Sequence, residues 1–364
     1  MKKILYFASV WAHIYNFHMP HIHRLEDLGF EVHVAADGVP EDSGFSHVHN
    51  LAIRKSFFAL ENIAALASLI KLIKHERFDI IYVHTTLAAF LVRLVKIFSF
   101  CRNVHLIYVC HGYFFETNQN GRVAKNLRSF AFLLAEKLLA SQTDMLVLMN
   151  HEDFISAQRY CLCRDIRFCH GMGLDPTKYE KIPASEKQIA GPVFLCVGEL
   201  FDRKNQKQII GAFREVVKCL PGAELWFAGD GRRKNDYKQL VKKLGLEHSC
   251  RFFGHISNIS NQYCAADVFI SASRCEGLPF CVMEALYFGL PVIASDIKGH
   301  RDLVEHGING MLFELDNELQ LAAHMIRLGS SEKERTRLAS RAVLPEKYFA
   351  NAVALEFASF LNLP

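Results

Sequence analysis

Short apolar runs alternate with helical patterns along most of this chain of 364 residues. The chain opens with an apolar run at residues 3–10, the segment W-A-H-I-Y-N-F-H, a helical pattern over Met19 to Leu28 and a second run, E-V-H-V-A-A. Such repeats of strand, loop, helix and strand predict an α/β fold with parallel sheets and crossover helices. Ligands bind at the carboxyl ends of strands in these sheets, so we expect residues 12–18 to form a loop that lines a site.

A hydrophilic stretch with prolines and lysines interrupts this rhythm, and the second half restarts with P-V-F-L-C-V-G-E-L. The chain also exceeds the size at which a single core usually keeps growing. We therefore expect an N-terminal α/β domain over 1–174, a linker over 175–190 and a C-terminal α/β domain over 191–344. A last helix, within 345–364, is expected to pack back on the first domain. Two domains joined in this way leave a cleft, the usual place for a ligand.

Composition narrows the class of protein further. A hydrophobic content of 51% with 22% charged residues is typical of a globular chain, and a net charge of +4 is too small to indicate nucleic-acid binding. The 11 cysteines are odd in number and scattered, which favours reduced thiols in the cytoplasm over a disulfide framework. Apolar runs stay shorter than the 18 or so residues that a membrane-spanning helix needs.

The stretch from Ser273 to Gly289 carries the clearest chemistry. Glu276 and Glu284 lie on either side of a Gly-Leu-Pro-Phe turn that opens a short helix, with Pro279 suited to the first helical position and Gly289 to the C-cap. Backbone N–H groups at a helix start are unpaired and favour a phosphate. The two carboxylates could accept hydrogen bonds from hydroxyls on either side of a diphosphate, which is the shape of a nucleotide-sugar.

Six segments of the second half occur in a specific order: G-E-L-F-D-R-K-N, G-D-G, F-F-G-H-I, S-A-S-R-C-E-G-L-P-F-C-V-M-E-A, G-L-P-V-I-A-S-D and G-I-N-G-M-L-F. This series resembles that of the family 4 glycosyltransferases, retaining enzymes many of which assemble bacterial polysaccharides. The resemblance implies the GT-B fold, in which two Rossmann-like parallel-sheet domains face each other across a cleft. The first domain would lie on the acceptor side, and the second would bind the nucleotide-sugar donor.

The resemblance implies roles for residues near the diphosphate. Glu276 would hold hydroxyls of the transferred sugar and Glu284 the ribose. Lys204 matches the lysine of the basic pair that neutralises the departing diphosphate, whereas Glu199 stands where the family usually has arginine. The planar guanidinium of Arg203 could supply the missing charge, although a surface role is the alternative. The segment that would cradle the diphosphate comprises Leu278, Pro279, Phe280 and Cys281.

The remaining donor contacts are implied more loosely. Gly229 and Gly231 match a turn that lines the nucleotide pocket, with an ordinary tight turn as the alternative, and His255 and Ile256 match the place where the base is received.

In the first half, His111 in C-H-G-Y matches a histidine that contacts the donor or positions the acceptor. The first loop has none of the family's usual glycines, so His13, Tyr15 and Asn16 are alternatives for the donor contact.

Two groups of histidine and cysteine residues are candidate metal sites. His13, His18, His21 and His23 are dense, but no carboxylate–cysteine pattern accompanies them. Cys161, Cys163, Cys169 and His170 have an uncommon spacing for zinc, and Cys169 falls in a predicted strand. The sequence has no Asp-x-Asp, the motif with which the other major glycosyltransferase fold holds a metal on the diphosphate. We therefore expect no metal and no cofactor, with the basic pair and the helix start acting on the diphosphate instead.

The sequence thus predicts a cytoplasmic retaining hexosyltransferase that moves a hexose or N-acetylhexosamine from a UDP-sugar to a lipid-linked or growing surface glycan. Basic and apolar helices near 54–75, 89–102 and 123–140 are either core helices with snorkelling lysines or a peripheral membrane face. Two rival interpretations stay open: a UDP-sugar 2-epimerase, and a non-catalytic nucleotide-sugar-binding subunit of a transferase pair.

Overall fold

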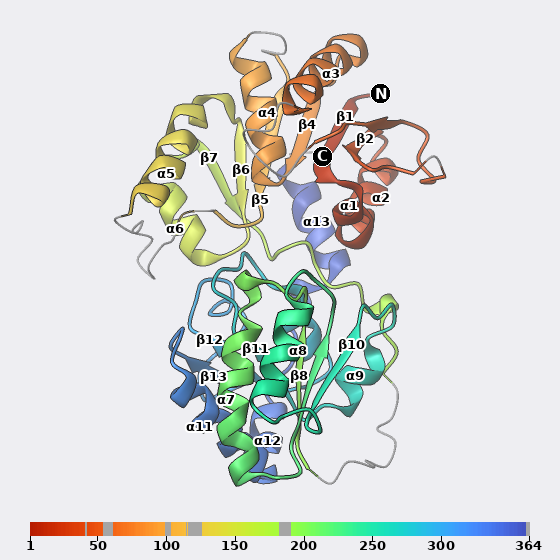
Figure 1. The fold of residues 1–364 in the computed structure, drawn as a ribbon. Coiled ribbons are helices and arrows are strands. Elements are labelled where there is room, and N and C mark those ends of the chain that lie inside the picture. Colours follow the sequence, from red (N-terminus) through yellow and green to blue (C-terminus); the bar gives the residue numbers. More distant parts are fainter. Residues whose placement is uncertain are drawn as a thin grey trace. The chain divides into compact units, whose positions relative to one another are not determined.

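A computed structural model describes residues 1–40, 42–53, 61–98, 103–113, 115, 126–181 and 191–361 (Figure 1). Parts of the three predicted basic helices (54–60, 99–102 and 123–125), most of the predicted linker (182–190) and the last residues (362–364) lie outside the described residues. The chain forms two compact units, one of Met1–Gly173 with Lys347–Pro364 and the other of Leu174–Glu346.

The first unit contains a seven-stranded sheet in which all neighbouring strands are parallel. In spatial order its strands are β3 (Val48–Asn50), β2 (Glu31–Asp37), β1 (Lys3–Val10), β4 (Ile80–His84), β5 (His105–Cys110), β6 (Met145–Leu148) and β7 (Asp165–Phe168). The helices between them are α1 (Trp11–Phe17), α2 (Met19–Asp27), α3 (Glu61–Glu76), α4 (Thr86–Ile97), α5 (Leu127–Leu139) and α6 (His151–Arg159). Strand order reverses between β1 and β4, the place where such sheets bind ligands.

The central strands of this sheet are buried almost from end to end, as in a sheet covered on both faces. A buried ion pair joins two of the covering helices: Arg93 Nη1 of α4 lies 2.7 Å from Glu136 Oε2 of α5, and Nη2 lies 3.1 Å from Oε1. The Arg93 guanidinium also stacks over the Tyr108 ring of β5. The two hydrogen bonds satisfy charges that would otherwise be costly to bury.

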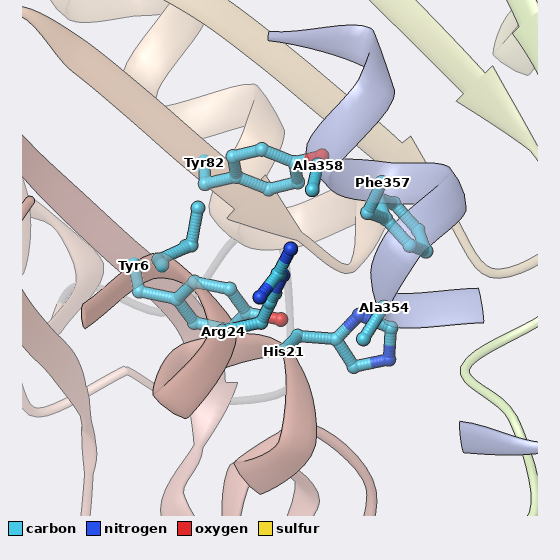
Figure 2. A pocket seen from close by; sticks show the side chains of 8 residues that line it. Tyr6, His21, Arg24, Tyr82, Ala354, Phe357 and Ala358 are labelled. Atoms are coloured by element: carbon cyan, nitrogen blue, oxygen red, sulfur yellow. The ribbon is translucent and has the colours of Figure 1, made fainter. Parts of the chain in front are cut away.

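The last helix, α13 (Ala350–Phe360), belongs to the first unit and packs against α2. Figure 2 shows its residues Ala354, Phe357 and Ala358 around a small pocket that is also lined by Tyr6, His21, Arg24, Leu25 and Tyr82. Gly173 allows the chain to approach this helix, because a Cβ there would lie 2.5 Å from the Ala350 Cα.

The second unit contains a six-stranded parallel sheet. Its strands, in spatial order, are β10 (Cys250–Gly254), β9 (Glu224–Ala228), β8 (Val193–Val197), β11 (Val268–Ser271), β12 (Val292–Ser295) and β13 (Gly310–Phe313). Its helices are α7 (Gln206–Cys219), α8 (Lys234–Lys243), α9 (Ser260–Ala265), α10 (Phe280–Tyr287), α11 (Glu318–Ser330) and α12 (Glu332–Ala339). Here the strand order reverses between β8 and β11.

The predicted fold class is confirmed: both halves are α/β units with parallel sheets. The expected loop at 12–18 is wrong, because α1 begins directly after β1. No glycine or proline interrupts Trp11–Phe17, and Ile14 is fully buried. None of the helices in the described part of the chain has the length and hydropathy needed to span a bilayer.

Three boundaries in the prediction also need correction. Pro279 is the N-cap of α10 rather than its first helical residue. At the other end Phe288 is the C-cap, and Gly289 follows it with a φ of +78°, where the missing Cβ removes the strain of a left-handed residue. Cys169 lies beyond the end of β7, not within a strand.

Candidate functional site

In the second unit, charged residues from two neighbouring strand ends meet where the strand order reverses. Lys204 follows β8 and Glu276 follows β11. Lys204 Nζ lies 2.8 Å from Glu276 Oε1, and Arg203 Nη1 lies 3.3 Å from Glu276 Oε2. Glu276 is only 6% exposed. We refer to Arg203, Lys204 and Glu276 as the charge cluster.

Local backbone features position the basic residues of this cluster. Asp202 to Lys204 form a single 3-10 turn, which ends at Asn205 in the left-handed region with a φ of 54°. Asparagine tolerates this conformation better than most residues. The backbone N–H of Arg274 donates to the carbonyl oxygen of Arg203 at 2.8 Å, so the segment that carries Glu276 is tied directly to the basic turn.

The electrostatics keep Glu276 and Lys204 charged. Burial alone would raise the pKa of Glu276, but the nearby charges and hydrogen bonds of Lys204 and Arg203 outweigh it and hold that pKa at about 2. Burial lowers the pKa of Lys204, whereas the Glu276 carboxylate more than offsets this, and the net shift is upward. Two cations thus share one carboxylate, and the Arg203 side chain stays 49% exposed. The excess positive charge suits an anionic ligand.

Glu284 lies on α10 and accepts two hydrogen bonds from tyrosines. The Tyr179 hydroxyl donates to Oε1 and the Tyr263 hydroxyl to Oε2, each at 2.6 Å. Tyr263 is fully buried and Glu284 is partly exposed. Each carboxylate oxygen has a second lone pair, so Glu284 is held in one orientation and can still accept bonds from a ligand.

The predicted phosphate cradle forms the turn into α10. Leu278, Pro279 and Cys281 are buried, Phe280 is partly exposed, and the N–H of Val282 donates to the Pro279 carbonyl oxygen at 3.2 Å. Burial raises the pKa of the Cys281 thiol to about 11, so the thiol is uncharged at neutral pH and does not repel a phosphate. The first-turn amides and the positive end of the helix dipole supply the anion-binding character.

Two predicted glycines serve close backbone packing. A Cβ on Gly229 would lie 2.1 Å from the Gly198 carbonyl oxygen, and a Cβ on Gly231 would lie 2.5 Å from that of Leu200. Both residues also have positive φ. They hold the turn after β9 against the loop that leads to Lys204. His255 is exposed and Ile256 is partly buried, both just after β10.

In the first unit, four histidines gather where the strand order reverses between β1 and β4. His13 lies on α1, His18 joins α1 to α2, His84 ends β4 and His111 follows β5. His18 Nε2 lies 2.7 Å from His13 Nδ1, and His84 Nδ1 lies 3.1 Å from His111 Nε2. The rings of His13 and His111 are 4.8 Å apart. Asn16, the other residue predicted on this segment, is exposed.

The histidines are uncharged at neutral pH. Burial lowers the pKa of His13 to about 4 and lowers those of His18, His84 and His111 well below their ordinary value. Next to His84, Thr85 has a φ of +72°, an uncommon conformation for a β-branched residue. Its hydroxyl lies 2.6 Å from that of Ser9. Strained backbone of this kind often marks a functional site.

Sequence reasoning missed several of these residues. His84 ends a buried strand just as His111 follows one, so the same pattern could have indicated it. His18 was considered only as a metal ligand. Tyr179 falls in the predicted linker and Tyr263 on a short helix, and nothing in their local sequence indicates that both reach Glu284.

Each parallel-sheet unit has a group of polar side chains where its strand order reverses: charged residues in the second unit and histidines in the first. This architecture defines a protein of the GT-B glycosyltransferase class. Solved structures with the same fold align with this protein over the full chain. The Anabaena protein HepE, in complex with UDP and glucose, aligns over 100% of both chains with a TM-score of 0.78 and 19% identity. A sucrose-phosphate synthase from Thermosynechococcus elongatus aligns over 100% of this chain and 98% of its own, with a TM-score of 0.79 and 16% identity.

Sequence comparisons identify the family. Residues 178–343 match the family Glycosyl transferases group 1, and residues 3–143 match the family Glycosyl transferase 4-like. EpsD of Bacillus subtilis (strain 168), itself assigned to the glycosyltransferases, is 32% identical over 90% of this chain and 87% of its own. An Escherichia coli UDP-Gal:α-D-GlcNAc-diphosphoundecaprenol α-1,3-galactosyltransferase is 26% identical over 71% of this chain and 68% of its own. The chain belongs to the group 1 glycosyltransferases, also called family 4, and is a nucleotide-sugar-dependent enzyme.

Proposed function

We propose that this enzyme is a retaining hexosyltransferase that transfers a hexose or N-acetylhexosamine from a UDP-sugar to a lipid-linked or growing surface glycan. The observation that carries the proposal is the charge cluster beside the start of α10. Two cations and a helix N-terminus at the carboxyl edge of one sheet suit a diphosphate. The enzyme would act in the cytoplasm, at the inner face of the membrane.

The donor would be held by groups of the second unit. Arg203, Lys204 and the turn Leu278 to Cys281 would bind the diphosphate, and Glu276 would accept hydrogen bonds from sugar hydroxyls. Glu284, oriented by its two tyrosines, would bind the ribose. The turn with Gly229 and Gly231, together with His255 and Ile256, would line the base. UDP in the HepE complex supports uridine as the base.

In the proposed reaction, the bond between the anomeric carbon and the diphosphate oxygen breaks while an acceptor hydroxyl attacks from the same face. The acceptor proton passes to the leaving diphosphate oxygen. Because the attack comes from the face that the diphosphate leaves, retention needs no protein nucleophile. Arg203, Lys204 and the α10 amides would stabilise the charge that develops on the diphosphate. His111 would contact the donor sugar or position the acceptor, with His13 and Asn16 as further donor contacts.

Ligand-induced stabilisation tests the donor assignment. UDP-, GDP- and ADP-sugars are compared by thermal shift, where a ligand at 100 times its Kd adds about 2.7 kcal/mol to the free energy of unfolding. We expect UDP-sugars to stabilise the protein most. Stabilisation by GDP- or ADP-sugars alone would contradict the uridine assignment.

The anomeric configuration of the product tests retention. An inverted configuration would exclude a retaining mechanism.

Two controls separate the rival functions. With UDP-sugar and no acceptor, a 2-epimerase converts the sugar, whereas a transferase leaves the sugar configuration unchanged. For the subunit alternative, a Glu276→Ala variant is introduced into cells that lack the wild-type gene. Normal glycan in these cells, against none in the deletion strain, would favour the non-catalytic subunit.

The exposed face of α5 supports a membrane-associated acceptor. Its apolar residues with side chains open to solvent recur at helical spacing and are 45% to 85% exposed: Leu127, Phe130, Leu134 and Leu138. Arg128 and Lys137 are exposed on the same helix. Apolar side chains flanked by cations are typical of a helix that lies on an anionic lipid surface.

We expect the double substitution Phe130→Glu and Leu134→Glu to reduce binding to phosphatidylglycerol vesicles at least about tenfold, because each apolar contact is replaced by a repelled charge. Co-sedimentation with the vesicles measures the effect. Leu319→Glu is the control, since Leu319 is at least as exposed as Phe130 and Leu134 but lies on α11 of the second unit. Equal loss in both variants, or none in the α5 variant, would rule out this face.

A further inference from the structure

Three imidazoles of the first unit converge in a way that its proposed role in transfer does not require. One ring nitrogen from each of His13, His18 and His111 lies within 4.8 Å of the other two. His18 is buried, and His13 and His111 are partly exposed, so the group opens toward solvent on one side. In the sequence His13, His18, His21 and His23 are close together, and no metal is expected there. The structure instead joins two of them to His111, which lies far along the chain.

Hydrogen bonds on the side away from the cluster fix the orientations of two of these rings. The hydroxyl of Tyr6 on β1 lies 2.7 Å from His18 Nδ1 and is fully buried with it. With the proton on Nδ1, His18 donates to Tyr6 and directs the lone pair of Nε2 toward His13. His84 similarly contacts His111 through Nδ1 and Nε2. Outer hydrogen bonds of this kind orient the histidines of metal sites.

The three rings also offer the type of ligand atom that a transition metal needs. Neutral imidazole is the form that binds transition metals, whereas magnesium and calcium prefer oxygen ligands. A group of three histidines therefore favours zinc among the common biological cations.

We propose that His13, His18 and His111 bind one Zn²⁺ ion. With Zn–N bonds of about 2.0 Å in tetrahedral geometry, ligand nitrogens lie about 3.3 Å apart. His13 Nδ1 and His18 Nε2 are 2.7 Å apart, sharing a hydrogen bond. Zinc binding therefore requires these two nitrogens to separate by roughly 0.6 Å and the proton of His13 to move to its Nε2. The fourth position is left for solvent.

A consequence follows that rests on the proposed function. Zinc on His111 occupies the residue that would contact the donor sugar or position the acceptor, so zinc inhibits transfer and a chelator restores it. The binding itself does not depend on that function. If zinc binds and transfer is unaffected, the role proposed for His111 fails while the metal site stands.

Tag-free, chelator-treated protein is titrated with Zn²⁺ against a chromophoric chelator. We expect one equivalent to bind tightly, and expect His13→Ala and His18→Ala each to weaken binding more than about 100-fold through loss of one ligand. Tyr6→Phe removes only the hydrogen bond to His18 Nδ1 and should weaken zinc binding about 10- to 100-fold. His23→Ala is the matched control, since His23 is exposed on the same helix as the buried His21.

A second control addresses the other group of possible ligands, Glu31, His33 and His47. Glu31 is already bonded to Lys3 and His33, so His47→Ala should leave zinc binding unchanged. The proposal would be overturned if the wild type bound no zinc tightly. It would also be overturned if His47→Ala lost the tightly bound zinc or if His13→Ala kept it. His13 is the more decisive position, because its ring is partly exposed and its replacement disturbs folding least.

Discussion

Replacing Lys204 with alanine is expected to lower kcat for sugar transfer about 10³-fold, the cost of losing one positioned charge that stabilises a developing anion. The Lys204 ammonium is 2.8 Å from the buried Glu276 carboxylate. In the proposed site its loss would remove a positive charge beside the diphosphate. It would also leave Arg203 as the remaining cation beside the Glu276 carboxylate in the charge cluster. Steady-state kinetics with a UDP-sugar donor measures the effect.

The same substitution has a separable effect on stability. Breaking a buried ion pair by removing one partner typically costs about 3–5 kcal/mol, whereas removing both partners costs less. We expect Lys204→Ala to lower the free energy of unfolding and the double variant Lys204→Ala, Glu276→Ala to recover part of that loss without recovering activity. Lys207→Ala, an exposed lysine on α7, is the control. An activity loss below tenfold in folded Lys204→Ala would show that this lysine does not act on the diphosphate.

The fold was predictable because parallel sheets impose a strong pattern on a sequence. Strands such as β1 and β5 are buried on both faces and appear as continuous apolar runs between helical segments. The errors lie where this pattern is weak. Residues 12–18 look like a loop because their polar side chains mask the one buried apolar position, Ile14, and β3 has only three residues.

The candidate site was predictable to the extent that strand ends determine it. Lys204, Glu276 and His111 each follow a buried strand, and the topology brings the first two together. The ion pair itself was not predicted, because a sequence does not reveal the spatial distance between two residues that are 72 positions apart. The tyrosines on Glu284 and the bond between His84 and His111 depend on side-chain packing in the same way.

The buried histidines make the first unit sensitive to acid, and this is the largest effect on stability that we expect. In that unit His13, His18, His21, His84 and His111 all have pKa values lowered by burial, to about 4 for His13 and His21. In the unfolded chain each titrates near 6.5. Above pH 6.5 neither state binds the protons, and these histidines contribute no pH dependence.

Below pH 6.5 the unfolded chain takes up protons that the folded unit excludes, so stability falls with pH until the folded-state pKa values are reached. Each histidine contributes up to about 1.4 kcal/mol per pH unit in this window. Between pH 6.5 and 5.5 the five together should remove on the order of 5 kcal/mol, a large part of the stability of an ordinary domain. Among the described residues of the second unit, His300 is the one fully buried histidine. Burial lowers its pKa to about 4, and this unit should lose far less stability.

The two tryptophans allow each unit to be followed separately. Trp226→Phe leaves Trp11 to report on the first unit, and Trp11→Phe leaves the buried Trp226 to report on the second. Urea unfolding with a chelator present, at pH 7.5, 6.5, 5.5 and 5.0, should show the Trp11 midpoint falling steeply below pH 6.5 while the Trp226 midpoint changes little. Parallel curves for the two reporters would mean that the histidines do not govern the acid response. A Trp11 midpoint unchanged down to pH 5.0 would mean that these rings can be protonated within the folded unit.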